Sequence, residues 1–326
     1  MTRIYITVDT EYSSDHFAKN GASGRAENFD QSIRGLTPDG EAGIFHQMDI
    51  LDRHGLKAVF FVDPMPALVW GTEAVTDIVA PILSRGHDVQ LHIHCEWLQF
   101  AGKANPLGNR TGNNMKDFSE ADQFTLIGYG IEQLMAAGAP RPIAFRAGNY
   151  GANDDTLRAL ARQGVAYESS HCPGIAHSDC AISLGPDQLL PLAYLGVTEV
   201  PIGSIAAAGG KQRHAQVTAL SAREICETVR HARDIGRESF TFVSHSFELL
   251  SRDRKRINRI IDQRFERACA YFAGLPGVDT ATFSDNPPRI ETSPRPSATA
   301  MLLPHDFART ARRMGEQALS NTLYGS

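Results

Sequence analysis

The sequence predicts an α/β protein built around an irregular barrel of parallel strands. Short β-branched or apolar runs alternate with helical patterns, which is typical of βαβ units and a parallel sheet. Seven or eight such strands fall within about 285 residues, a density that favours a barrel over an open sheet. The 326-residue chain is 42% hydrophobic and 21% charged, as expected of a globular protein that buries a sizeable core.

Each expected strand is a short run enriched in residues that fit a pleated sheet. The expected strands are Arg3–Val8, Lys57–Val62, Asp88–Ile93, Pro142–Arg146, Val165–Glu168, Val197–Pro201, Phe240–Ser244 and Val278–Phe283. Apolar residues at helical spacing predict the intervening helices. The expected helices are Glu41–His54, Glu73–Arg85, Glu120–Ala137, Asp154–Gln163, Ala222–Ile235 and Asp253–Ala273.

Two long polar segments, Tyr12–Gly40 and Gln99–Phe118, follow the first and third strands. Structureless loops of this length usually serve as lids or binding loops. Both follow the carboxyl ends of strands, where the active sites of barrels assemble. The alternative is a tolerated insertion at the surface.

Composition divides the chain into three parts. Residues 1–285 form the expected barrel, and residues 286–300, rich in Pro and Ser, form an expected linker. Residues 301–326 carry an amphipathic pattern and form an expected helical arm. The arm would pack on the barrel, lie on the surface or join two copies in a homo-oligomer, and the sequence leaves these alternatives open.

Charge, cysteine content and hydropathy indicate which partners and which compartment to expect. The net charge of −5 and the pI of about 6.2 come without a clustered basic face, so no nucleic-acid partner is expected. Five cysteines without a CxxC pair favour a reduced protein over a disulfide framework. The N-terminus shows no signal-peptide pattern and no run of 18 apolar residues occurs, so we expect a cytoplasmic protein without a transmembrane segment.

Polar residues suited to catalysis follow several of the predicted strands. In VQLHIHCEW, His92, His94 and Glu96 alternate and therefore share one face, which fits either a metal site or a solvent-exposed strand end. Asp9 and Glu11 share a face by the same rule. Two further strands end at Arg146, two residues before Gly148, and at His245, between two serines.

In this order and context the motifs TVDTE, GHDVQLHIHCE, FRAGNYG and FVSHS resemble those of the NodB-homology polysaccharide deacetylases, carbohydrate esterase family 4. The resemblance covers most of residues 1–283. HIHCEW together with FRAGNYG is most similar to the cytosolic branch associated with lipopolysaccharide biosynthesis. The resemblance implies a distorted (β/α)7 barrel that binds one divalent metal ion, with zinc expected first and cobalt, nickel or manganese as alternatives.

The resemblance also implies a role for each motif. The expected metal ligands are Glu11, His92 and His94, the base is Asp9, its orienting residue is Arg146 and the acid is His245. The chain departs from the family pattern at two positions. Thr10 replaces the usual second aspartate, and alignment on Gly86-His87 places Glu96 where the second histidine would stand. Asp9 and Glu96 are therefore alternative ligands.

These residues predict a metal-dependent hydrolase of amide C–N bonds. The expected activity is N-deacetylation of an N-acetylated sugar, supplied as a small molecule or linked to a nucleotide or lipid. One alternative is a hydrolase of cyclic amides on the same fold. Another is a non-catalytic binding protein with a degenerate metal site, motivated by Thr10 and Glu96. An unrelated HxH amidohydrolase would carry that motif on the first strand, not the third.

Three other features have simpler explanations. The HCPGIAHSDC segment has no common zinc-binding spacing. Cys95 lies between two proposed ligands, but alternation turns it to the opposite face, where we expect it to pack. Asp63 precedes Pro64 and either lines the site or initiates a turn.

Overall fold

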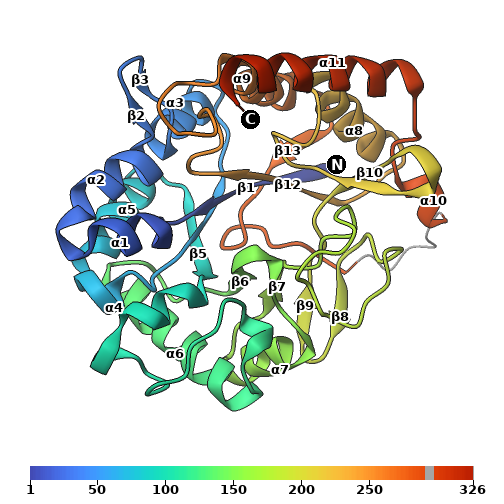
Figure 1. The fold of residues 1–326 in the computed structure, drawn as a ribbon. Helices are drawn as coiled ribbons and strands as arrows, with labels where there is room; N and C mark the ends of the chain where they lie inside the picture. Colours follow the sequence, from blue (N-terminus) through green and yellow to red (C-terminus); the bar gives the residue numbers. More distant parts are fainter. Residues whose placement is uncertain (291–296, 326) are drawn as a thin grey trace.

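The structure, a computed structural model, describes residues 1–290 and 297–325 and confirms the α/β barrel (Figure 1). One curled sheet follows the order β12-β1-β4-β5-β6-β7-β9-β8, and β13 pairs with β1 beside it. All neighbours are parallel except β8 and β9. The strands are β1 (Thr2–Thr10), β4 (Val59–Val62), β5 (Asp88–Ile93), β6 (Ala144–Ala147), β7 (Tyr167–Glu168), β8 (Leu192–Tyr194), β9 (Val197–Glu199), β12 (Ser239–His245) and β13 (Val278–Thr280).

Irregular backbone completes the barrel between β9 and β12. After β9, the Gly203 N–H donates to the Thr241 carbonyl of β12 at 3.0 Å. Farther along, the Val243 N–H donates to Ala215 at 2.9 Å and the Val217 N–H donates to Val243 at 3.0 Å. The sheet therefore curls into a distorted barrel in which part of the wall is not regular strand.

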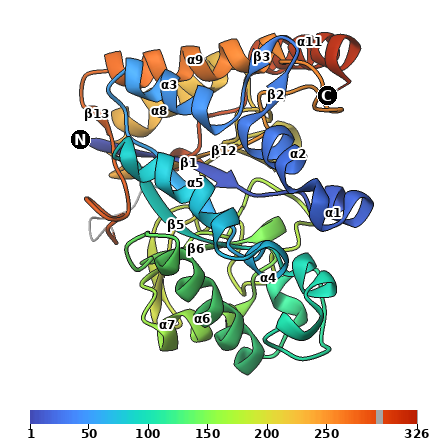
Figure 2. The ribbon, with the colours of Figure 1, turned by 90° about the vertical axis from the view of Figure 1, so that its left-hand side faces the viewer.

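Helices surround the curled sheet (Figures 1 and 2). They are α3 (Ile44–Arg53), α4 (Ala67–Trp70), α5 (Glu73–Ser84), α6 (Glu120–Ala136), α7 (Asp154–Gln163), α8 (Ala222–Asp234) and α9 (Arg259–Gly274). Capping boxes at Asn153 and Ser221 fix the starts of α7 and α8. The prediction that the last of these helices starts at Asp253 is wrong, because the Asn258 side chain caps α9 by accepting from the N–H groups of Ile260 and Ile261.

Side chains of β1 alternate between the core that lies under the helices and the inside of the barrel. Ile4, Ile6 and Val8 belong to the large core between the sheet and the helices. Tyr5 points into the barrel, where its ring lies 5.5 Å from that of Phe283. Asp9 has the same parity as Tyr5 and therefore ends the inward-facing row at the carboxyl end of the strand.

The segment 12–40 is not the structureless loop that its polarity predicts. It contains α1 (Ser14–Asn20), α2 (Arg25–Phe29), a π-helical turn at Asp30–Arg34 and a hairpin of β2 (Leu36–Thr37) and β3 (Gly40–Glu41). Aromatic contacts hold it: Tyr12 and Phe17 each lie 5.2 Å from the ring of Trp70. Segment 99–118 consists of short 3-10 turns and irregular backbone, closer to the prediction.

The C-terminal residues pack on the barrel. Figure 2 shows α11 (Phe307–Tyr324) beside α9, and ion pairs join Glu316 to Arg264 at 3.2 Å and Arg313 to Glu224 at 3.3 Å. Before it, β10 (Ser204–Ala206) pairs with β11 (Gln212–His214), and α10 (Ala298–Met301) is one short turn. The proposed linker 286–300 lies partly outside the described residues, and the division into barrel, linker and arm stays a prediction.

No helix within residues 1–290 and 297–325 is long and apolar enough to cross a membrane.

Candidate metal centre

The sheet brings four polar strand ends to one edge of the barrel. In the register of the strands, Asp9 of β1 lies opposite His245 of β12, and His92 of β5 lies opposite Arg146 of β6. Glu11 follows the end of β1. Residues far apart in the sequence therefore meet because parallel strands end on the same side of the barrel.

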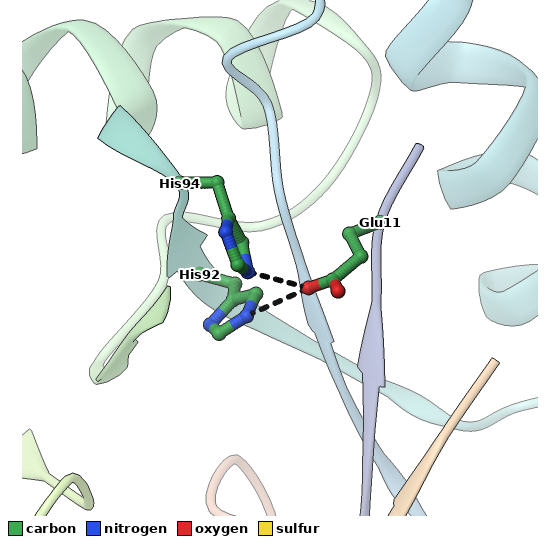
Figure 3. A group of neighbouring side chains, drawn as sticks. All are labelled: Glu11, His92 and His94. Carbon is green, nitrogen blue, oxygen red and sulfur yellow. Dashed lines mark hydrogen bonds and ion pairs between the residues drawn. The ribbon is translucent and has the colours of Figure 1, made fainter. Parts of the chain in front are cut away.

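Glu11, His92 and His94 form the Glu–His–His group. Their ligand atoms all lie within 4.8 Å of one another. Nε2 of His94 lies 2.6 Å, and Nε2 of His92 3.2 Å, from the same Glu11 carboxylate oxygen. Figure 3 shows both imidazoles directed toward that oxygen.

Each imidazole of this group also has a hydrogen-bond partner at its second nitrogen, Nδ1. Nδ1 of His92 donates to the Arg146 carbonyl at 2.7 Å, which leaves the Nε2 lone pair toward the group. Nδ1 of His94 lies 3.2 Å from Glu96, whose carboxylate also accepts from Asn149 at 3.0 Å. Glu96 therefore contacts the side of His94 that faces away from Glu11.

Burial and charge act against each other in this group. Burial disfavours ionisation of Glu11, but the neighbouring imidazoles, His94 first, outweigh it and hold the pKa of Glu11 well below its usual range. Burial also disfavours protonation of His94, yet Glu11 and Glu96 hold the pKa of His94 well above its usual range. A concentration of charge in a partly buried site is typical of functional groups.

The Glu–His–His group fits a divalent cation. One carboxylate and two imidazoles are a common three-ligand set for zinc, which leaves a further position open. A carbonyl or carboxylate on the remote nitrogen of each histidine is the usual support for such ligands. His92 and His94 both have this support.

Asp9 and Arg146 form a buried ion pair next to this group. Nη1 of Arg146 donates to the Asp9 carboxylate at 2.6 Å, and Arg146 is fully buried. The same guanidinium donates to the Thr7 hydroxyl at 2.9 Å and to the Ser169 carbonyl at 3.0 Å, and lies 4.4 Å above the Phe61 ring. These contacts fix the guanidinium and, through it, the position of the Asp9 carboxylate.

His245 faces Asp9 from β12, and a second carboxylate, that of Glu248, contacts its other nitrogen. Its Nε2 lies 3.9 Å from Asp9, and its Nδ1 lies 3.0 Å from Glu248. Gln216 and Thr218 donate to the same Glu248 carboxylate. Burial disfavours the imidazolium, but Glu248 first, then Asp9 and Glu11, raise the pKa of His245 to about 9.

Three adjoining cavities open at this edge of the barrel. The central cavity, about 210 Å³, is lined by Asp9, Glu11, His92, His94, Tyr150 and His245. The acidic cavity, about 540 Å³, shares Glu11 and His94 with it and reaches Asp15, Glu96 and Asp179. The arginine cavity, about 410 Å³, shares His245 with the central cavity and reaches Glu248, Arg252 and Arg254. Phe247 lines all three.

Three further residues singled out in the sequence, Thr10, Cys95 and Asp63, lie outside the Glu–His–His group. Thr10 is buried, and its hydroxyl donates to the Val8 carbonyl at 3.1 Å. By alternation it lies on the face of β1 that carries Val8, opposite the face of Asp9 and Glu11. Cys95 is buried as expected. Asp63 initiates a turn by accepting from the Met65 N–H and also accepts from the backbone of His94, while burial raises its pKa to about 7.

Sequence reasoning missed Glu248, Asn149 and Tyr150. Glu248 follows His245 by three residues, a spacing that could have drawn attention to it. Asn149 and Tyr150 both have a φ of 56°, an unusual value for residues with side chains. The buried Tyr150 hydroxyl has no hydrogen-bond partner within the described part of the chain and lines the central cavity. Strained backbone of this kind often occurs at functional sites.

Comparison with known proteins supports the fold. No protein-family model matches the sequence, and no curated protein matches it at the sequence level. A protein of Mycobacterium smegmatis, assigned as a polysaccharide deacetylase, has a similar structure at a TM-score of 0.56 and 16% identity, covering 90% of this chain and 94% of that one. A family 4 carbohydrate esterase of Streptomyces lividans is less similar, with a TM-score of 0.42 at 11% identity over 87% and 93% of the two chains, and adds no support to the fold.

A second structure with comparable similarity belongs to a different class of enzyme. The 4-alpha-glucanotransferase of Thermococcus litoralis matches at a TM-score of 0.51 and 13% identity, over 88% of this chain and 41% of that one. The similarity to the Mycobacterium smegmatis protein confirms the barrel fold expected from the resemblance to NodB-homology deacetylases. Since one fold carries several activities, the function has to be argued from the site.

Proposed function

We propose that the protein is a metal-dependent N-deacetylase of an N-acetylated sugar. The observation that carries the proposal is the convergence of three elements on the central cavity: the Glu–His–His group, the Asp9–Arg146 pair and His245. Amide hydrolysis needs an activated water, a stabilised oxyanion and a protonated amine, and this set of residues supplies a group for each need. The similar structure of the assigned deacetylase from Mycobacterium smegmatis agrees with this proposal.

Glu11, His92 and His94 would hold the cation, zinc first. When bound there, a divalent cation would supply Lewis-acid chemistry, lowering the pKa of water and polarising the acyl carbonyl. Glu96 and the Arg146 carbonyl orient the two imidazoles for this task. Glu96 itself would not be a ligand, because it contacts the opposite nitrogen of His94.

Asp9 is the proposed base. It would take a proton from the attacking water as the oxygen of that water bonds to the acyl carbon. Arg146 keeps the carboxylate in one place through its 2.6 Å contact and balances its charge inside the barrel. The Thr7 hydroxyl and the Ser169 carbonyl hold the guanidinium, so the position of Asp9 depends on contacts deep in the barrel.

His245 is the proposed acid. It would give its proton to the amide nitrogen while the C–N bond breaks, so that the products are acetate and the free amine of the sugar. Glu248 favours the imidazolium that this step consumes, since it is the largest of the charges that raise the pKa of His245. The proton taken by Asp9 and the proton given by His245 balance the addition of water.

Metal content and acetate release test the proposal together. Protein purified without added metal and then reloaded with zinc should bind about one zinc ion per chain and release acetate from N-acetylated amino sugars. His92→Ala should lose both properties. His177→Ala, at an exposed position outside the three cavities, is the matched control and should keep both. Zinc content near zero after reloading would exclude the metal-dependent reaction, whereas bound zinc without acetate release would favour a binding protein.

A further inference from the structure

The two cavities that flank the central cavity differ in charge. The acidic cavity carries four carboxylates, from Glu11, Asp15, Glu96 and Asp179, and one guanidinium, from Arg254. The arginine cavity carries the guanidinium groups of Arg252 and Arg254, and its one carboxylate, Glu248, is paired with His245. A substrate that spans the site therefore meets opposite charges on its two sides.

Arg254 stands at the boundary between these cavities and is held in place. Its guanidinium lies 4.1 Å from the centroid of the Phe247 ring, and its Nη1 donates to the Ser32 hydroxyl at 2.9 Å. Its backbone has a φ of 58°, an unusual conformation for a residue with a side chain. The contacts that fix it come from two segments, 246–254 and 30–34, that are distant in sequence.

The charge of Arg254 is not neutralised by a direct partner. Within residues 1–290 and 297–325, no carboxylate oxygen lies within 4.0 Å of a guanidinium nitrogen of Arg254, so it forms no ion pair there. Burial disfavours the charged guanidinium and lowers its pKa, whereas Glu11 and Asp15 act in the opposite direction from farther away. A stacked, partly buried arginine without a carboxylate partner is well suited to bind an oxyanion from solution.

We propose that the arginine cavity binds an anionic group carried by the amine half of the substrate, and that Arg254 is the residue that recognises this group. The inference rests on the proposed function, because His245 defines which half is the amine. His245 lines both the central and the arginine cavity, so the amine that it protonates leaves on the arginine side. The substrate class is then an N-acetylated amino sugar with a carboxylate or a phosphate.

A comparison of matched sugars tests Arg254 as a determinant of specificity. Acetate release by the zinc-loaded protein would be measured with N-acetylglucosamine, N-acetylglucosamine 1-phosphate and N-acetylglucosaminuronic acid. Arg254→Gln should lower the ratio of kcat/KM for the anionic over the neutral sugar by roughly 10- to 100-fold, the usual effect of losing a charge-assisted hydrogen bond. Arg254→Lys should lower it less, and the anionic sugar with the larger ratio identifies the oxyanion.

Lys255→Gln is the matched control, because it removes one charge from the next residue, which is exposed and lines none of the three cavities. It should leave the ratio unchanged. An equal loss on neutral and anionic sugars in Arg254→Gln would overturn the proposal, since a structural defect lowers all rates together.

Binding of the amine products separates this proposal from the proposed function. At least one of the two anionic products, glucosamine 1-phosphate and glucosaminuronic acid, should bind the zinc-loaded protein more tightly than glucosamine does, and Arg254→Gln should remove the difference. If no sugar releases acetate but this difference persists and depends on Arg254, the deacetylase proposal fails and the anion site stands. If neither glucosamine 1-phosphate nor glucosaminuronic acid binds the wild-type protein more tightly than glucosamine does, the anion site is wrong whether or not acetate is released.

Discussion

The two sides of the central cavity use histidine in opposite ways. On the ligand side, His92 donates from Nδ1 to a backbone carbonyl, and its Nε2 faces a Glu11 oxygen 3.2 Å away. On the proton side, Nδ1 of His245 faces the Glu248 carboxylate at 3.0 Å, and its Nε2 faces Asp9 at 3.9 Å. A carbonyl that accepts from Nδ1 directs Nε2 toward the cavity as a possible metal ligand, whereas a carboxylate partner favours an imidazolium that can give a proton.

His94 shows that the partner of Nδ1 does not decide the role alone. It has a carboxylate partner, Glu96, as His245 does, yet its Nε2 converges with that of His92 on a single Glu11 oxygen. His245 has no such convergence and instead borders two cavities. The role of each histidine therefore depends on both nitrogens, the one that is held and the one that faces the cavity.

The largest expected effect distinguishes the role of Glu11 as a metal ligand from the role of Asp9 as a base. Glu11→Gln should lose both bound zinc and acetate release, because it removes the one anionic ligand of the Glu–His–His group. Asp9→Asn should keep zinc and lose roughly 10²–10⁴-fold in kcat, the usual contribution of general base catalysis. Elemental analysis and acetate release measure the two properties on the same sample.

Asp9→Asn also replaces one partner of a buried ion pair, so its melting temperature has to be followed. Asparagine still offers an oxygen to Arg146, which should preserve the fold. If Asp9→Asn emptied the site while Glu11→Gln kept zinc, the assigned roles of these two carboxylates would have to be exchanged.

The second effect isolates the proton side. His245→Ala should keep zinc and lower the rate on an amide by roughly 10²–10⁴-fold. An activated ester, whose leaving group needs little protonation, should lose much less. Rates on matched amide and ester substrates provide the measurement. Equal losses on both, with a lowered melting temperature, would show that His245 only packs beneath the site.

A smaller effect is expected from the support of the ligand side. Glu96→Gln keeps the shape of the side chain and an oxygen for Asn149, but removes the charge beside His94. Zinc affinity should fall by roughly 10- to 100-fold, as is common when such a support is lost, and kcat at saturating zinc should change little. Competition with a chelator measures the affinity. Complete loss of zinc would instead make Glu96 a ligand.

Strand ends were the part of the site that the sequence could predict. Alternation along a strand is strict, so Asp9 with Glu11 and His92 with His94 could each be assigned to one face, and the structure brings all four to the central cavity. The order of strands and helices likewise predicted the barrel. Helix starts were less certain, because a cap such as Asn258 acts through side-chain geometry that composition does not reveal.

Loops were the part that the sequence could not predict. Segment 12–40 is polar overall, yet Tyr12 and Phe17 anchor it to Trp70, a residue that no local pattern connects to them. Arg254 comes near the metal centre only because its loop turns back over Phe247 toward Ser32. Such contacts depend on tertiary packing and have no periodic signature in the sequence.

The smallest expected effect concerns the pH dependence set by Glu248. Its charge is the largest of those that raise the pKa of His245 from 6.5 to about 9, against the opposing effect of burial. In the wild-type protein the acid should therefore stay protonated up to about pH 9, and the alkaline limb of kcat/KM should lie there. Glu248→Gln should move this limb down toward neutral pH, with little loss of activity at acidic pH where His245 remains protonated.

The pH dependence of stability gives an independent measure of the interaction between His245 and Glu248. Because the folded-state pKa of His245 lies above its unfolded value of 6.5, the pair stabilises the fold fully below that pH, and this stabilisation disappears as the pH rises through about 9. The difference in free energy of unfolding between wild type and Glu248→Gln should accordingly be largest in mildly acidic solution and shrink toward pH 9. Glu132→Gln, an exposed change of equal charge on α6, should alter neither the limb nor this pH dependence. An alkaline limb that stays in place in Glu248→Gln would assign it to a group other than His245, and the proton side of the cavity would lose its acid.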